Sequence, residues 1–213
     1  EAFLRAVKLV YASTLNPDVL AYRRRWELVD RDEQMAVLVQ RVAGERHGHH
    51  FYPTLAGVAL SHNLYVWADR LDPTKGVILL VLGLGTRAVD RVGGDYPRMI
   101  PISHPALRPE IGTAIAKYAQ RHIDVIDLAS NEFATMRVSD VVESGQVRSL
   151  PLFVSELRDG GIYDPISLNL RLDPERRLIL TFNNLIRRTD FVSLLGRILA
   201  TLEGREPDQL PLD

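Results

Sequence analysis

A glycine-punctuated loop that follows an apolar run is the first candidate for binding chemistry. Residues 83–88 read Gly-Leu-Gly-Thr-Arg-Ala, which matches the pattern G-x-G-x-x-G/A, where small residues let backbone N–H groups approach a phosphate. The segment that follows is interrupted by Gly93 and Gly94 before a crossover helix can form. No acidic residue lies between Arg98 and Leu107, about 20 residues on, where a ribose-binding carboxylate is expected. A dinucleotide-binding fold is therefore disfavoured. A structural turn and a nucleotide-facing loop of another fold remain, and the second is favoured.

Histidines and carboxylates give weaker signals. His47, His49 and His50 lie in one short segment and have imidazole nitrogens that can bind zinc, but the sequence has no cysteine and no H-E-x-x-H pattern. A solvated loop is the favoured interpretation. His104 has no accompanying nucleophile pattern, and paired carboxylates occur by chance at this density. We therefore assign no catalytic residue and no metal ligand.

Composition and charge bound the class of protein. The 213 residues include 26 basic and 27 acidic ones and no cysteine, with a formal net charge of −1. This balance gives no sign of a nucleic-acid or membrane-surface partner, and no apolar run approaches the roughly 18 residues that span a bilayer. The run Arg23-Arg24-Arg25 favours a solvated helix face over a phosphate site. We expect a cytoplasmic protein.

Periodicity predicts helices before a sheet. Apolar residues at helical spacing predict a helix over 2–13, and Asn16-Pro17 predicts the start of a second one that runs to about Trp26. Apolar and β-branched runs predict antiparallel strands between residues 35 and 82. These strands are expected over 35–42, 51–61, 64–68 and 77–82.

The second half is expected to mix short strands and helices. The loop 83–94 has room for one helical turn. Further strands are expected over 123–128, 135–138, 150–154 and 177–182, and helices over 111–122 and from Thr189 or Asp190 to Gly204.

Four segments together carry a family resemblance. They are Ala6–Ser13 with the following Ala21-Tyr22-Arg23, then Met35–Val42, Leu55–Ser61 and Leu82–Gly85. In this order and spacing, over residues 3–98, the chain resembles the N-terminal, ATP-grasp domain of phosphoenolpyruvate synthase and pyruvate phosphate dikinase.

The resemblance implies a fold class and a domain organisation. We expect an α+β fold, an ATP-grasp-like subdomain with an antiparallel sheet flanked by helices, truncated at both ends. Residues 1–128 would form the nucleotide-binding subdomain, and 129–213 would continue the same domain with short strands and a C-terminal helix.

The resemblance also implies an activity. Members use ATP and Mg²⁺ to phosphorylate a histidine on a swivelling domain, which passes the phosphoryl group to pyruvate. We expect the full-length protein to use ATP and Mg²⁺ and to meet pyruvate or phosphoenolpyruvate through domains absent from this chain. The fragment would retain neither cofactor and be inactive alone, and homo-oligomerisation stays open. Two alternatives are a non-catalytic ATP-grasp-derived regulatory or binding module and, less favoured, an unrelated ATP-grasp ligase.

Site residues are carried over by position. Gln40 and Arg41 would lie near the adenine, while Gly83 and Gly85 would let the backbone turn close to the nucleotide. Arg87 completes the proposed nucleotide-binding set.

Two departures from the family pattern lie near this loop. Thr86 stands where the family has an acid, and Pro97-Arg98 stands where it has Pro-Asp. Arg87, Arg91 and Arg98 would then either meet phosphate oxygens or be exposed.

Overall fold

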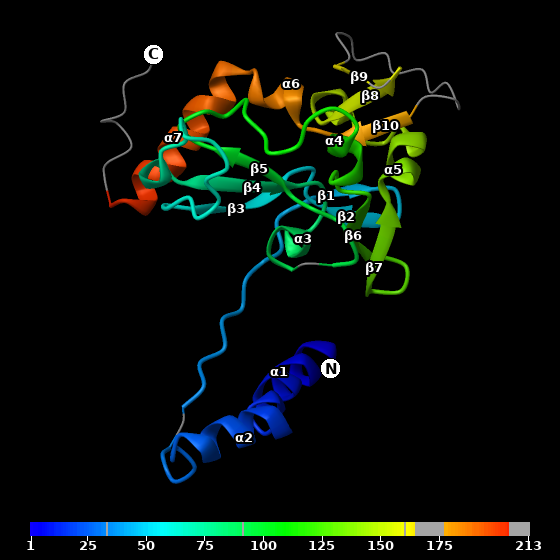
Figure 1. Ribbon diagram of the computed structural model, residues 1–213. Helices are drawn as coiled ribbons and strands as arrows, with labels where there is room; N and C mark the ends of the chain where they lie inside the picture. Colours follow the sequence, from blue (N-terminus) through cyan, green and yellow to red (C-terminus); the bar gives the residue numbers. More distant parts are fainter. Residues whose placement is uncertain (33, 91, 160, 165–176, 205–213) are drawn as a thin grey trace. The chain divides into compact units, whose positions relative to one another are not determined.

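The structure is a computed structural model that describes residues 1–32, 34–90, 92–159, 161–164 and 177–204 (Figure 1). Contacts divide the chain into two units, Glu1–Val42 and Ala43–Asp213. The elements are helices and antiparallel sheets, which confirms the predicted α+β class.

The first unit contains two helices, α1 (Ala2–Ser13) and α2 (Pro17–Arg25). Both follow the predicted bounds closely, and Asn16 occupies the N-cap position of α2 with proline in its first turn. Neither helix contains a buried residue. The helices are therefore set by local signals rather than by a core of their own.

The arginine run of α2 divides into two roles. Arg23 is half-buried and donates from Nη2 to the carbonyl oxygens of Leu28 (3.0 Å) and Arg31 (2.6 Å), which fixes the turn after the helix. Arg24 and Arg25 are exposed, in keeping with a solvated helix face.

The strand predicted over Met35–Val42 is wrong. Residues 34–44 have no strand pairing, and Leu38 is 80% exposed. A strand requires a neighbour to satisfy its backbone N–H and C=O groups. The described part of the first unit contains helices and loops only, so the apolar pattern finds no partner there.

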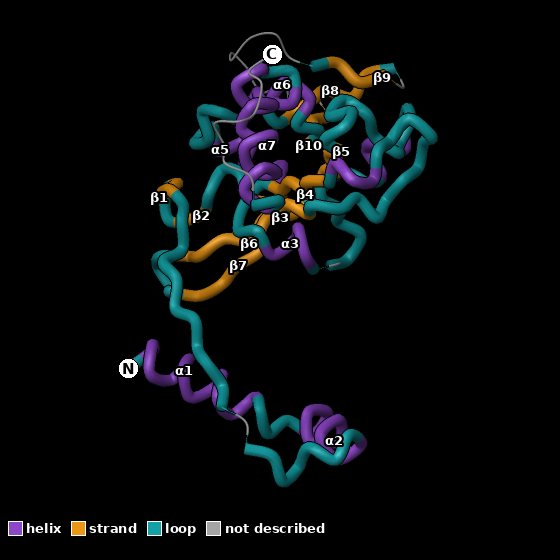
Figure 2. The backbone as a smooth tube through the Cα atoms, turned by 90° about the vertical axis from the view of Figure 1, so that its left-hand side faces the viewer, coloured by secondary structure: helices purple, strands orange, loops and turns teal. Residues whose placement is uncertain are grey.

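The second unit contains three antiparallel sheets, drawn in orange in Figure 2. The first sheet has the order β1 (Glu45–His47), β2 (His50–Tyr52), β6 (His122–Asp127), β7 (Glu132–Arg137). The second has the order β3 (Ala56–Leu60), β4 (Val77–Val81), β5 (Arg98–Pro101). The third has the order β10 (Arg177–Leu180), β8 (Val154–Arg158), β9 (Gly161–Tyr163).

Short helices connect these strands, and one longer helix closes the unit. The helices are α3 (Thr86–Val89), α4 (Ala114–Lys117), α5 (Val138–Ser144), α6 (Asn183–Ile186) and α7 (Thr189–Leu202), with 3₁₀ turns at Pro73–Lys75 and Leu150–Leu152. Figure 2 shows α7 alongside the β3–β4–β5 sheet, and its buried side chains include Phe191 and Leu195. The single helical turn predicted within 83–94 and the terminal helix are confirmed.

Several predicted boundaries in the second unit are wrong. The expected histidine loop is the β1–β2 hairpin, with His47 buried against the ring of Tyr52. The single strand expected over 51–61 is interrupted at Pro53, so that β2 and β3 enter different sheets. Residues 64–68 form no strand, and the helix expected over 111–122 is reduced to α4.

The core of the second unit lies between its sheets. Ile78 and Leu80 of β4, Ile123 and Val125 of β6, and residues of β8, β10 and α7 form one buried apolar cluster. Burial of this kind stabilises a fold by about 25 cal/mol per Å² of apolar surface. β6 and β7 pair with one another on either side of residue 128. The subdomain boundary predicted between residues 128 and 129 stays a prediction.

Candidate functional site

The glycine loop leaves the end of β4 and packs against β6. Gly83 has φ +91, and a Cβ there would lie 2.9 Å from the backbone oxygen of Asp124 and 3.0 Å from Cβ of Ile123. Leu84 N–H donates to the same Asp124 oxygen at 2.9 Å. Only glycine accepts both this φ and this approach, so Gly83 sets the course of the loop.

Gly85 is under no such packing demand. It has an ordinary φ of −56, and a Cβ there would meet Cβ of Ala56 at 3.5 Å, an ordinary van der Waals contact. A glycine here is therefore not explained by the fold. Its role in nucleotide binding stays a prediction.

Arg87 lies in a buried ionic network rather than in solvent. Its Nη1 is 2.6 Å from Asp95 Oδ2 and its Nη2 is 3.0 Å from Asp124 Oδ1, and all three side chains are at most 7% exposed. Thr86 and Thr135 donate their hydroxyls to Asp124 at 2.7 and 2.8 Å. The guanidinium joins α3 to β6 and to the segment before β5, and so holds the glycine loop in place.

The network also determines the charge state of Asp124. Burial alone would raise the pKa of this carboxyl, but hydrogen bonds from Thr86, Thr135 and Arg87 and the charge of Arg87 outweigh it, and the pKa is lowered. Asp124 is therefore ionised at neutral pH, with both carboxylate oxygens accepting hydrogen bonds.

Two neighbouring residues that sequence reasoning missed complete the support of the loop. Gln120, 3% exposed, donates to Leu82 O and His122 O at 2.8 Å and accepts from Leu82 N–H at 2.9 Å. Asp95 accepts from His122 Nδ1 at 2.8 Å as well as from Arg87. Gln120 lies 38 residues from Leu82 in sequence, Asp95 lies 8 residues from Arg87, and no local pattern marks either residue.

The predicted site residues fall into two groups. Gly83, Gly85 and Arg87 are brought together at the end of β4. Gln40 and Arg41 are exposed residues of the first unit. Their proposed roles stay predictions, as does direct contact of Arg87 with a nucleotide.

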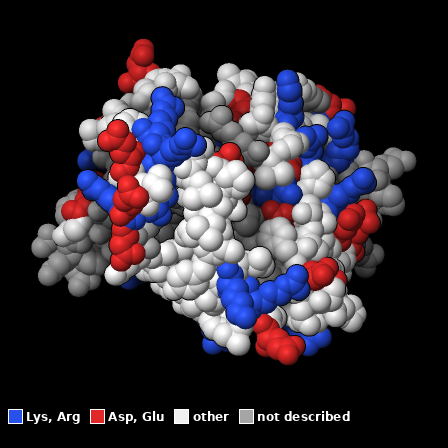
Figure 3. All heavy atoms as spheres, turned by 90° about the horizontal axis from the view of Figure 1, so that it is seen from below, with Lys and Arg blue, Asp and Glu red and all other residues white. Residues whose placement is uncertain are grey.

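Charged side chains of both signs are visible on one face of the molecule (Figure 3). Figure 3 shows basic and acidic residues interspersed among uncharged ones on the face that it draws. In the segments that the structure describes, none of the helices has the length and apolar character needed to cross a membrane.

A comparison with protein families decides which family these elements represent. The model for the pyruvate phosphate dikinase AMP/ATP-binding domain matches residues 1–157 of the 213. The chain belongs to this family. No curated protein and no solved structure matches it.

The AMP/ATP-binding family match extends beyond the motifs visible in the sequence. Those motifs end near residue 98, whereas the match continues through β6, β7 and α5 to β8. Both the Met35–Val42 segment and the glycine loop lie within it. The family resemblance inferred from the sequence is thus confirmed, and ATP binding becomes the family-level function.

The carboxylates beside the glycine loop do not fit a Mg²⁺ site. Asp95 and Asp124 share Arg87, and all four of their carboxylate oxygens accept hydrogen bonds from the protein. Magnesium needs oxygen ligands free to coordinate it. Over residues 1–32, 34–90, 92–159, 161–164 and 177–204, no group of three or more His, Asp or Glu side chains is arranged to hold a metal.

Proposed function

We propose that this chain is the nucleotide-binding part of a phosphotransferase of the phosphoenolpyruvate synthase type. In that activity ATP phosphorylates a histidine on a swivelling domain, and the phosphoryl group then passes to pyruvate. The observation that carries the proposal is the match of the AMP/ATP-binding family over residues 1–157. The activity takes place in the cytoplasm, and neither nucleic acid nor membrane is a partner.

Some of the site residues contact the nucleotide directly, and others hold the glycine loop in its conformation. Gln40 and Arg41 lie near the adenine, and Gly85 lets the nucleotide approach the backbone. Gly83 and Arg87 act indirectly: the close packing of Gly83 on β6 and the ion pairs of Arg87 hold the loop in one shape. Preorganised support of this kind is what phosphoryl transfer requires, because its catalysis depends mostly on positioning and charge.

The chain alone binds Mg·ATP weakly and catalyses no transfer. Its loop carboxylates are committed to Arg87 and the two threonines, so they leave the metal without ligands there. Mg²⁺ and ATP act together only in a protein that supplies further ligands and the phosphohistidine domain. A calorimetric Kd for Mg·ATP in the low micromolar range would refute this part of the proposal.

A second candidate is a non-catalytic binding or regulatory module. The observation that favours it is Thr86, which stands where the family has an acid and whose hydroxyl donates to Asp124 at 2.7 Å. A loop built this way retains the fold of the nucleotide-binding turn without a free carboxylate. Such a module would bind adenine nucleotide without forming phosphohistidine.

Labelled ATP distinguishes the two candidates. The natural gene product is incubated with ATP labelled at the β or γ phosphate and examined for acid-labile phosphohistidine. The phosphotransferase forms it, and added pyruvate discharges it. A folded protein that binds ATP but takes no label supports the module instead.

Substitution at Gly85 tests the placement of the nucleotide. Gly85→Ala adds a methyl group that the fold accommodates, so folding is retained while ATP binding weakens. Gly161→Ala in β9 is the matched control, because its nearest contact would also be an ordinary 3.4 Å. Equal ATP binding by both variants and the wild type would place the nucleotide elsewhere.

A further inference from the structure

Two arginines away from the glycine loop have no carboxylate partner among the described residues: Arg98 is buried and Arg108 is partly buried. Arg98, the first residue of β5, is 7% exposed and pairs with Leu80 of β4 in register. It donates from Nη1 to Met99 O at 2.6 Å and from Nη2 to Leu107 O at 3.1 Å and, at 3.4 Å, to a further carbonyl of the same loop. These acceptors are neutral, and the charge of Glu110 counteracts only part of the effect of burial on Arg98.

Arg108 lies beside it and is also incompletely satisfied. Its Nη2 donates to Thr181 O at 3.3 Å. Its Nη1 and the Nε of Arg98 are buried, and neither meets an acceptor in the described part of the chain. Buried donors are paired in the great majority of native structures, so two such donors on neighbouring cations indicate an acceptor that the described part of the chain does not provide.

The electrostatics support the same interpretation. Burial, followed by the charge of Arg108, lowers the pKa of Arg98 to about 9. Burial also lowers the pKa of Arg108. The negative charges of Glu110 and Asp164 raise this pKa and so offset part of the effect of burial. Among the described residues, no carboxylate forms an ion pair with either guanidinium. Two like charges held together at low dielectric are costly unless an anion joins them.

The two arginines open onto a common cavity of about 240 Å³. Asp164 also lines it, but this carboxylate already accepts from Arg187 at 2.8 Å and from Asn183 at 3.1 Å. Arg98, Arg108 and Arg187 against Asp164 give the lining a positive balance. Apolar side chains complete the wall: Ala106, Ile115, Ile162 and Ile186.

We propose that this cavity binds a phosphate group, free or carried by a small metabolite. The guanidinium groups of Arg98 and Arg108, which line the cavity, donate to its oxygens, and the anion neutralises the paired cations. The tetrahedral group offers acceptors in several directions, as two guanidinia from different segments require. The isoleucine wall leaves room for a short organic substituent. None of the lining residues belongs to the glycine loop, so this site is separate from the proposed ATP site.

Equilibrium dialysis of the full 213-residue chain against labelled inorganic phosphate tests the proposal directly. At constant ionic strength, the wild type shows saturable binding that unlabelled phosphate displaces and chloride does not. Competition by glycerol phosphate, compared with inorganic phosphate, distinguishes a metabolite site from a site for the free ion. Absence of saturable binding to the folded wild type overturns the proposal.

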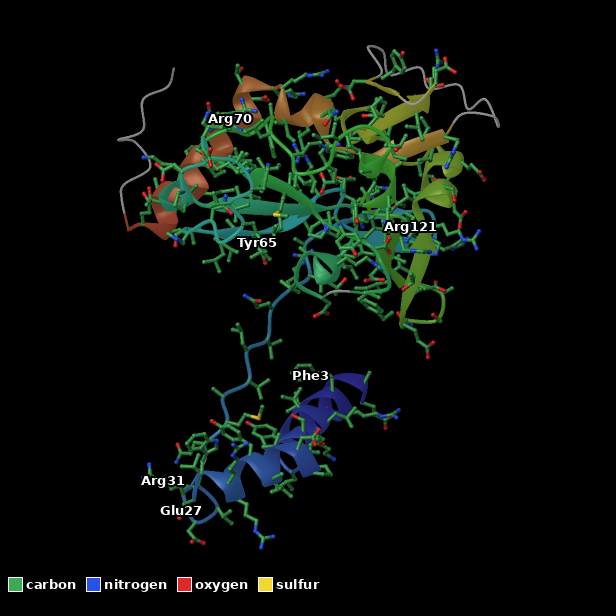
Figure 4. All side chains as sticks on the ribbon, in the orientation of Figure 1. Phe3, Glu27, Arg31, Tyr65, Arg70 and Arg121 are labelled. Atoms are coloured by element: carbon green, nitrogen blue, oxygen red, sulfur yellow. The ribbon has the colours of Figure 1, made fainter. Side chains whose placement is uncertain are left out.

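Two variants assign the binding to this cavity. Arg108→Gln removes one charged donor and weakens phosphate binding by about tenfold or more. Arg70→Gln is the control, since Arg70 is an exposed arginine outside the cavity and is labelled in Figure 4. Phosphate binding by this variant stays at the wild-type value. Unchanged binding by folded Arg108→Gln, or an equal loss in both variants, contradicts the assignment.

Hydrogen exchange keeps the test decisive if Arg108→Gln does not fold. In the wild type, phosphate slows exchange at the amides around residues 98–108 and 181–187, and protection confined to other segments overturns the proposal. Gly85→Ala separates the two sites. This variant leaves phosphate binding unchanged even if it weakens ATP binding. The proposed phosphate site and the proposed ATP site can therefore fail independently of one another.

Discussion

Arg87 Nη2 lies 3.0 Å from Asp124 Oδ1, and this ion pair joins the helix after the glycine loop to the strand beside it. Both side chains are nearly inaccessible, and Asp95 receives the other arm of the same guanidinium. An arginine that the sequence suggested for phosphate contact is thus committed to the interior. Through its ion pairs with Asp95 and Asp124, it supports the proposed nucleotide loop from within the protein.

Removal of the Arg87 guanidinium should be strongly destabilising. Arg87→Met leaves Asp95 and Asp124 buried near one another without their cation, and breaking such a pair costs about 3–5 kcal/mol. Denaturant unfolding measures the change. Arg188→Met is the control, because its ion pair with Asp190 is exposed and little change is expected. Equal effects in both variants would contradict the structural role of Arg87.

Acid should weaken the second unit through Asp124. Its pKa is lowered in the folded chain, so its stabilising contribution is present above the pKa of the unfolded chain and is lost as pH falls through the folded value. Urea unfolding between neutral pH and about pH 3 measures this loss. Asp124→Asn should be less stable at neutral pH and less sensitive to acid. An unchanged acid sensitivity would assign the effect to other carboxylates.

The two loop glycines should respond differently to alanine. Gly83→Ala forces a side chain into φ +91 and against Asp124, which should cost about 1–3 kcal/mol. Gly85→Ala should retain the wild-type stability, since its methyl group meets only Ala56 at 3.5 Å. Thermal unfolding of both variants makes the comparison. A large loss in Gly85→Ala would mean that the loop is packed more tightly than described.

Gln120 should be a structural residue of the loop. Gln120→Ala leaves the buried N–H and C=O of Leu82 without their partner, and each such group costs about 1–3 kcal/mol. Gln146→Ala, an exposed glutamine, is the control. Urea unfolding that shows no difference between the two variants would remove Gln120 from the loop support.

Local sequence signals predicted the elements that depend on few distant contacts. Asn16-Pro17 set the start of α2, the run from Val77 gave β4, and the periodicity after Thr189 gave α7. Each has its signal within its own residues, as a cap, a continuous apolar run or a helical stripe. The α+β class was expected from the family resemblance.

The errors arose where the structure depends on a distant partner. Met35–Val42 has the composition of a strand but no neighbour within its unit, and residues 64–68 likewise remain unpaired. The side-chain interactions that hold the glycine loop in place could not be predicted from the sequence for a related reason. Gln120 reaches Leu82, and Arg87 reaches Asp124, across 37 or 38 residues of sequence. No local pattern shows that such side chains will meet.

Photolabelling with an azido-adenine analogue of ATP is the most direct test of the central proposal, that the chain binds adenine nucleotide at the residues predicted for it. Covalent capture records even weak binding, and peptide mapping identifies the labelled segments. We predict label in the peptides that contain residues 35–42 and 83–87, suppressed by excess ATP. Label elsewhere, or label in these peptides that ATP does not suppress, would contradict the account.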